Sequence, residues 1–435
     1  MSTSRSGSIP EAGDPAGVRD PHGRLDGPLA LAEPVEGVRP RWVLSVTLAT
    51  LGVNAVLFAC IKIYLALQAQ QFDAGQKEAV LALVTGVGAA VSLVANPVFG
   101  AVSDRTVSRF GRRVPWVVIG AGIAVVGLLV LAVSPGIGVM VVGWSLVQAG
   151  CNAMTAALTA AVPDRVPRRQ RGRVGGWIAL GTTTGILLGM VIANVARDLL
   201  PGYLLCAAVI VVLAVPYLRG SRDVPLQRHE RPEASTRELL TGFWISPRRH
   251  PDFGWAWITR FLVFLGNSMF TLYLLYFLQD AVHHPDPTFG VLVLTGCYVA
   301  AVLVTAVIAG PASDRIGRRK PFVIGASLVI AAASLIAAFV PTFSGALVAA
   351  IVLGIGFGAY LAVDFALLTE VLPAAANRGR DMGVINIAAS LPQVLAPVIA
   401  WPLVTSGGGF VALFCCAALA GLLGGVFVAP IRSVR

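Results

Sequence analysis

Two charged loops of the same pattern constrain this chain more than any other feature. The first reads Gly100-Ala-Val-Ser-Asp104-Arg105 and continues, after a short spacer, as Gly111-Arg112-Arg113-Val-Pro-Trp116. The second half repeats the order as Gly310-Pro-Ala-Ser-Asp314-Arg315-Ile-Gly317-Arg318-Arg319-Lys-Pro-Phe322. The two Asp-Arg pairs, at 104 and 314, lie 210 residues apart, about half of the apolar part of the chain. A loop repeated at this spacing predicts two similar halves.

The segments between these loops are long and apolar. The chain is 56% hydrophobic and 13% charged, whereas soluble domains carry about 25% charged residues. Its mean hydropathy is +0.78. Since a spanning helix needs about 20 apolar residues, we predict an all-α integral membrane protein with twelve transmembrane helices in two pseudo-symmetric six-helix bundles. The predicted spans are 43–67, 79–102, 114–134, 138–162, 174–196, 202–218, 253–278, 289–312, 321–340, 345–371, 383–405 and 410–429.

These spans divide the chain into five parts. Residues 1–41 are predicted to be a disordered cytoplasmic tail, rich in Pro and Gly and without apolar periodicity. Residues 42–218 form the N-terminal bundle and 253–430 the C-terminal bundle. A cytoplasmic loop, 219–252, with a short interfacial helix near 236–245, joins them, and 431–435 form a cytoplasmic tail.

The positive charges predict the orientation. Of the 33 Lys and Arg residues, all but four fall on one side of the predicted membrane. The exceptions are Lys77 and Arg197 on the other side, and Lys62 and Arg260 within spans. The positive-inside rule then places both termini in the cytoplasm of a multi-pass protein of the cell membrane. Because the charge serves topology, it does not indicate a nucleic-acid partner.

No residues suited to catalysis gather in the sequence. The six cysteines mostly lie in apolar runs, the five histidines lie in tails or loops, and no metal or nucleotide spacing is present. The stripe Gly181-x-x-x-Gly185-x-x-x-Gly189 is typical of close helix packing rather than of a phosphate loop. We therefore expect no enzyme activity, cofactor or metal, and a monomer whose partners are a small solute, a proton and the lipid bilayer.

The repeated loops resemble the signature of the major facilitator superfamily of secondary transporters, Gly-x-x-x-Asp-Arg-x-Gly-Arg-Arg, which follows the second span and recurs after the eighth. The second copy matches closely. The first carries a four-residue insertion that is similar to the glycoside–pentoside–hexuronide and sucrose-transporter branch. The resemblance covers residue 41 to the end. It implies alternating access, with the solute bound near the midplane between the halves.

The resemblance also implies a role for the loops. The first copy (Gly100, Asp104, Arg105, Gly111, Arg112 and Arg113) would clamp the start of span eleven, and the second (Gly310, Asp314, Arg315, Gly317, Arg318 and Arg319) the start of span five. Together they would latch the cytoplasmic side shut. The alternative is that the arginines only anchor to anionic lipid and set topology.

Ionisable groups within spans are costly and become functional candidates. Arg260 in span seven and Asp364 in span ten both lie about seven residues from the cytoplasmic end, at a depth of about 10 Å. The resemblance implies that spans seven and ten line the same side of the solute cavity. We predict that the two residues pair there, either as a substrate or proton site that opens when Asp364 is protonated or as a permanent pair that holds two helices in register. Lys62, near the outer end of span one, is expected to extend toward the interface.

Uncharged polar residues mark the remaining lining that the resemblance implies. These are Asn54, Gln148, Asn152, Asn267, Tyr273 and Tyr360. They suit a hydroxyl-rich solute, although hydrogen bonds between helices explain any single one equally well.

Two functions stay open at this point. The first is proton-coupled uptake of a sugar or glycoside, which the extended first loop favours. The alternative is proton-antiport efflux of a hydrophobic drug or secondary metabolite. A lining poor in charge favours efflux, as does the absence of Asp and Glu from the first six spans, where melibiose-type permeases bind their coupling cation.

Overall fold

The computed structural model describes residue 34 and residues 37–221, 251–316, 319–371, 378–405 and 407–431, with side chains except at 168, 310, 311, 314, 316, 365–371 and 378–386. The predicted N-terminal tail and the central loop with its interfacial helix lie almost entirely outside the described residues. The first half contains α1 (Pro40–Ala59), the π-helical turn η1 (Cys60–Tyr64), α2 (Leu65–Phe72), α3 (Lys77–Asp104), α4 (Val114–Ala132), α5 (Ile137–Arg165), α6 (Arg168–Val195) and α7 (Leu199–Gly220). The second half contains α9 (Pro251–Leu272), α10 (Leu274–Tyr276), the π-helical turn η3 (Phe277–Ala281), α11 (Pro287–Ile316), α12 (Lys320–Phe339), α13 (Phe343–Val371), α14 (Arg378–Thr405) and α15 (Gly409–Val426).

The helices account for the predicted twelve spans. Within the described residues, eleven helical segments are long and apolar enough to cross a membrane. The twelfth is α9 together with α10 and η3, two pieces that meet at an angle of 45°. The first span is one continuous helix over Pro40–Phe72, because η1 joins α1 to α2 without a break. The chain is therefore a multi-pass, all-helical membrane protein.

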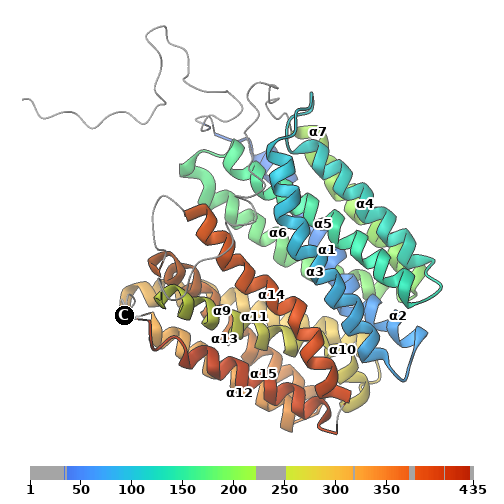
Figure 1. Cartoon of the computed structure of the whole chain (residues 1–435), viewed down its shortest axis with the longest axis vertical. Coiled ribbons are helices and arrows are strands. Elements are labelled where there is room, and N and C mark those ends of the chain that lie inside the picture. Colours follow the sequence, from blue (N-terminus) through green and yellow to red (C-terminus); the bar gives the residue numbers. More distant parts are fainter. Residues whose placement is uncertain are drawn as a thin grey trace, which may run out of the picture.

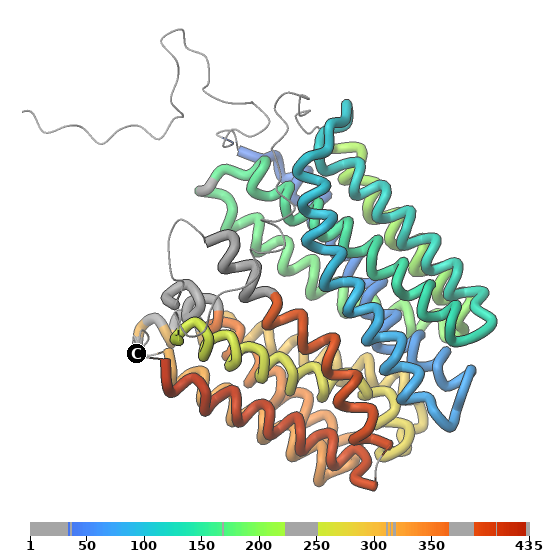
Figure 2. Tube along the Cα trace, in the orientation of Figure 1, coloured from blue at the N-terminus to red at the C-terminus, as the bar shows by residue number. Residues whose placement is uncertain are grey.

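The helices pack as two bundles whose contacts repeat. In the first half α1 packs on α6 and α7, α5 packs on α3 and α4, and α4 packs on α7. Each pair has its counterpart six spans later: α9 on α14 and α15, α13 on α11 and α12, and α12 on α15. Figures 1 and 2 show the two bundles side by side. The halves meet along α3 with α14 and along α6 with α11, which are also counterparts of each other. This repetition in space confirms the pseudo-symmetry that the repeated loops predict.

Glycines bring α6 unusually close to α1. A Cβ added at Gly181, Gly185 or Gly189 would lie 2.7, 2.6 or 2.5 Å from the backbone oxygen of Thr47, Leu51 or Ala55. Real Cβ atoms do not tolerate such distances. The glycine stripe is therefore a packing face, as predicted from its spacing.

The two ends of the molecule differ. We call the end where α1 begins, and where loops 105–113 and 166–167 lie, the basic end, and the other the opposite end. In Figure 1, α3 and α14 lie side by side along the boundary between the two halves. Polar contacts between the halves close the opposite end. They join Lys77 to Asp280 (2.6 Å), Arg197 to Asp286 (2.7 Å), Tyr276 to the carbonyl of Ala66 (2.8 Å), and Asn194 to the carbonyl of Thr288 (3.3 Å).

Candidate functional site

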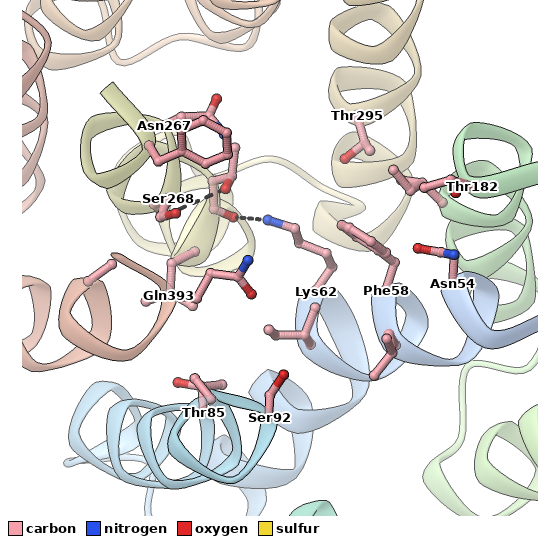
Figure 3. A pocket seen from close by; sticks show the side chains of 18 of the residues that line it. Asn54, Phe58, Lys62, Thr85, Ser92, Thr182, Asn267, Ser268, Thr295 and Gln393 are labelled. Carbon is pink, nitrogen blue, oxygen red and sulfur yellow. Dashed lines mark hydrogen bonds between the residues drawn. The ribbon is translucent and has the colours of Figure 1, made fainter. Parts of the chain in front are cut away.

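A cavity of about 630 Å³ lies between the two bundles. The first half lines it with α1, η1, α3, α5 and α6, and the second half with α9, α10, α11, α13 and α14. Figure 3 shows side chains from several of these helices turned toward the shared space. A site built from both halves is what a carrier needs, because movement of one half against the other then changes its exposure.

Four of the polar residues predicted for the lining are found there: Asn54, Gln148, Asn152 and Asn267. The structure adds polar residues that sequence reasoning missed, namely Thr50, Thr85, Ser92, Thr155, Thr159, Thr182, Ser268, Thr271, Thr295, Tyr298 and Gln393. A signal for some of them is present in the sequence. Thr155 and Thr159 follow Gln148 and Asn152 at helical spacing, so that all four share one face of α5.

Aromatic rings form another part of the lining. Phe264 of α9 and Phe357 of α13 meet edge to face, with ring centres 5.3 Å apart. The hydroxyl of Tyr298 donates to Oδ1 of Asn267 at 3.0 Å, which fixes the amide of Asn267 at the cavity wall. Rings beside oriented amides suit the binding of a solute that has both apolar faces and hydroxyl groups.

The structure corrects the expectation for two tyrosines. Tyr273 does not line the cavity. It lies at the break between α9 and α10, where its hydroxyl donates to the carbonyl of Glu78 at 3.0 Å across the two halves. Tyr360 is also absent from the lining: it is buried, its ring centre lies 6.3 Å from that of Phe264, and its hydroxyl donates to Asp364.

Arg260 and Asp364 are brought together as an ion pair, as their matching depths predict. Asp364 is buried, and its second oxygen accepts a hydrogen bond of 2.7 Å from Tyr360. The guanidinium of Arg260 lies 4.9 Å from the ring centre of Phe264. The pair was placed in the cavity from the sequence, but neither residue lines it. Phe264 does line the cavity, and the pair lies beyond it on the side of the basic end.

Lys62 departs most from expectation. Instead of extending toward the membrane interface, its side chain lines the cavity. Its Nζ donates to the carbonyl of Thr271 at 2.7 Å, a bond that joins the two halves (Figure 3). Lys62 belongs to η1, and a π-helical turn inserts a residue that changes the direction of the side chains within it. Helical counting from the span's end could not have found this.

The first charged loop folds around Arg113. Its guanidinium lies 2.6 Å from Asp104 and 2.7 Å from Asp164 at the end of α5, and Arg112 is 3.1 Å from Asp164. Burial lowers the pKa of Arg113, but the hydrogen bond and charge of Asp164, with those of Asp104, raise it overall above its ordinary value. Gly111 has a φ of 86°, which favours glycine at this turn. Sequence reasoning missed Asp164 because its partner is 51 residues away.

The latch itself stays a prediction. The side chains at the start of α14, which the first loop was predicted to clamp, lie outside the described residues, as do Gly317, Arg318 and the side chain of Asp314. Gly310 lies within α11, Arg315 is exposed in its last turn, and Arg319 immediately precedes α12. The described contacts tie the first loop to α5 within its own half.

Comparisons with known proteins agree with this architecture. The family model of the Major Facilitator Superfamily matches residues 43–294 and 256–435. Solved structures that share the fold include a POT family transporter in complex with a thioalcohol-conjugated peptide (TM-score 0.72, 12% identity, 92% of this chain and 98% of that one). The nucleoside transporter NupG also shares it (TM-score 0.71, 13% identity, 90% of this chain and 100% of that one).

Curated relatives match over a shorter stretch. Two proteins named multidrug resistance protein MdtL, from Shewanella oneidensis strain MR-1 and Shewanella sp. strain ANA-3, are 37% and 36% identical over 102 residues. The match spans 23% of this chain and a quarter of the length of these relatives. From the family match over nearly all of its length, the chain belongs to the Major Facilitator Superfamily, and it is a membrane transporter of small solutes rather than an enzyme.

Proposed function

We propose that this protein is a secondary active transporter that takes up a sugar or glycoside by alternating access, coupled to the proton. The observation that carries the proposal is the cavity shared by both halves, with a row of amide and hydroxyl groups on α5 and aromatic rings on α9 and α13. Its volume of about 630 Å³ is ample for a mono- or disaccharide. Hydroxyl-rich solutes need this combination of donors, acceptors and flat apolar surfaces.

The proposed orientation places the basic end in the cytoplasm, with both termini inside and the protein in the cell membrane. The support is the concentration of Lys and Arg on one side of the predicted spans. The opposite end, closed by the contacts of Lys77 and Arg197, would then face outward. In this orientation the structure corresponds to a state in which the solute site is sealed from outside.

The proposed proton site is the pair of Arg260 and Asp364. Asp364 is buried and holds both Arg260 and the hydroxyl of Tyr360. Protonation of its carboxylate would remove the attraction to Arg260 and free α9 to move relative to α13. Because the pair lies just beyond Phe264, a change there would reach the cavity wall through one side chain.

A second candidate is proton-antiport efflux of a hydrophobic drug or secondary metabolite. It is favoured by the name of the MdtL relatives and by the apolar side chains between the polar groups of the lining. Cationic drugs fit this cavity poorly, because Lys62 places a positive charge in it.

The experiment that separates the two candidates is a thermal-shift panel on the purified chain in detergent, with mono- and disaccharides in one set and hydrophobic amines and antibiotics in the other. A ligand at about 100 times its dissociation constant should stabilise the protein by about 2.7 kcal/mol. Stabilisation by a sugar, followed by uptake of that sugar into proteoliposomes under a pH gradient, is the expected result. Stabilisation by hydrophobic amines or antibiotics alone would contradict sugar uptake and support the efflux candidate.

A further inference from the structure

Lys62 gives the cavity a charge that sugar binding and proton coupling do not use. Among the described residues that line the cavity, it is the one charged side chain. The partner that the structure shows for its Nζ is a neutral backbone oxygen, that of Thr271. No carboxylate of the described residues lies within ion-pair distance of it. A charge inside a membrane protein is costly and indicates a function.

Lys77, the other lysine near the opposite end, shows how the chain neutralises a cation that joins the two halves without lining the cavity. Lys77 lies 2.6 Å from Asp280 and has the ring of Tyr276 beneath it. Lys62 has no such carboxylate, although an ammonium carries three donors and the bond to Thr271 uses one. Lys62 and Gln393 turn into the same part of the cavity (Figure 3), which Asn267 and Ser268 also line. The missing counter-charge is therefore one that a ligand can supply.

On the proposed function, in which this cavity binds the transported solute, we infer that the solute carries a carboxylate and that Lys62 binds it. A single ammonium balances one negative charge. A phosphate group at neutral pH carries between one and two charges and is held best by several donors. The described lining offers no second cation. Within the sugars and glycosides of the proposed function, the class of solute is thus one that carries a single carboxylate, such as a sugar acid, rather than a sugar phosphate.

The position of Lys62 also links binding to the closed end. Thr271 belongs to the second half and lies two residues before the break at Tyr273, whereas Lys62 belongs to the first half. Their bond can persist only while these two parts stay together. When the halves separate, Lys62 loses the carbonyl of Thr271. A carboxylate on the bound solute can then still pair with the ammonium and neutralise its charge.

The test uses pairs of probes that differ by one charge. Wild type and Lys62→Gln, purified as full chains, are titrated in thermal-shift and calorimetric assays with glucuronate, gluconate and lactobionate, each beside its neutral amide, and with glucose and lactose. Wild type should bind at least one acid about 10- to 100-fold more tightly than its amide, the range expected for a hydrogen bond to a charged group. Lys62→Gln should bind the acid no better than the amide and keep its affinity for the amide. Lys62→Arg should retain the preference in part.

Lys77→Gln is the matched control, because it removes a cation from the same end of the protein but outside the cavity lining. It should retain the preference for the acid. Loss of that preference in Lys77→Gln as well as in Lys62→Gln would make the effect conformational and overturn the inference. So would a wild-type protein that binds no acid better than its amide. If the wild type shows no preference for an acid but still binds neutral sugars, the inference fails and the proposed function stands. If the wild type prefers an acid through Lys62 but does not take that acid up under a pH gradient, the proposed function fails and the inference stands.

Discussion

The Nζ of Lys77 lies 2.6 Å from the carboxylate of Asp280 and 4.8 Å from the ring centre of Tyr276. Lys77 begins α3 in the first half, and the other two residues belong to α10 and η3 in the second. The lysine side chain is 11% exposed and that of the aspartate 39%, so water screens the ion pair only in part. The Lys77–Asp280 ion pair therefore holds the two halves together at the opposite end, and it must break when that end opens.

We expect Asp280→Asn to shift the protein toward a state open at this end. Loss of a partly screened ion pair is worth about 1 kcal/mol, or about fivefold in the ratio of closed to open molecules. Double electron–electron resonance between spin labels at residues 75 and 342, both exposed at this end, would measure the shift. The exchanged pair, Lys77→Asp with Asp280→Lys, should restore the closed state. Identical distance distributions for wild type and Asp280→Asn would contradict the prediction.

Neutralising the Arg260–Asp364 pair should uncouple transport from the pH gradient. The single variant Asp364→Asn leaves a buried arginine uncompensated, at a cost of about 3–5 kcal/mol, so the informative protein is Arg260→Gln with Asp364→Asn. We expect this double variant to fold and to exchange labelled solute across proteoliposomes, but not to accumulate it under a pH gradient. Accumulation equal to that of wild type would show that the pair only holds α9 and α13 in register.

Much of this architecture could be predicted from the sequence, because it depends on local properties. Apolar length gives the spans, and the glycine stripe of α6 gives a packing face. The pairing of Arg260 with Asp364 follows from counting residues inward from two helix ends, which works because both helices are regular over that distance.

The rest depends on irregular backbone and on contacts between distant segments. Lys62 lies in a π-helical turn and Tyr273 at a bend, and at both places the regular period of 3.6 residues fails to give the direction of the side chain. Tyr360 shares a helix with the cavity-lining Phe357 but is buried against Phe264 of α9 and does not line the cavity, a difference that only the packing of the two helices reveals. Asp164 lies in the last turn of α5 and Arg113 immediately before α4. The packing of α4 on α5 brings them together, and no spacing in the sequence indicates that contact.

The two acidic partners of Arg113 should separate stability from transport. Asp164 is 24% exposed, and Asp164→Asn should lower the free energy of unfolding by about 1.5–3 kcal/mol, since it removes a charged hydrogen bond to Arg113 and an ion pair with Arg112. Asp104 is 54% exposed. Because Asp104 is so exposed, Asp104→Asn should leave stability nearly unchanged. It should slow transport, because Asp104 belongs to the predicted latch of the first loop. Thermal melts and initial rates in proteoliposomes check both, and normal transport by Asp104→Asn at normal expression would remove the latch.

Adding one methyl group to the packing face of α6 should destabilise the first half. In Gly185→Ala the new Cβ would lie 2.6 Å from the carbonyl oxygen of Leu51, so α1 and α6 must move apart. Overpacking of this kind costs about 1–3 kcal/mol. Gly172→Ala on the same helix is the control, because nothing lies within 4 Å of its added Cβ. We expect a lower melting temperature for the first variant and an equal or higher one for the second.

Closure through Asp286 should be insensitive to pH in the physiological range. The backbone N–H of Phe289 donates to one carboxylate oxygen at 3.1 Å, and Arg197 of the other half donates to the second at 2.7 Å. The backbone hydrogen bond, and after it the contact with Arg197, hold the pKa of Asp286 below its ordinary value. A carboxyl group with a lowered pKa contributes its stabilisation fully above the ordinary value of about 3.9 and loses it only as the pH falls through the lowered pKa.

The difference in closed fraction between wild type and Asp286→Asn, measured with the same spin labels, should therefore stay constant from about pH 5 to pH 8. A difference that instead disappeared near pH 6 would mean that another titrating group controls this contact, since Asp286 is fully ionised there.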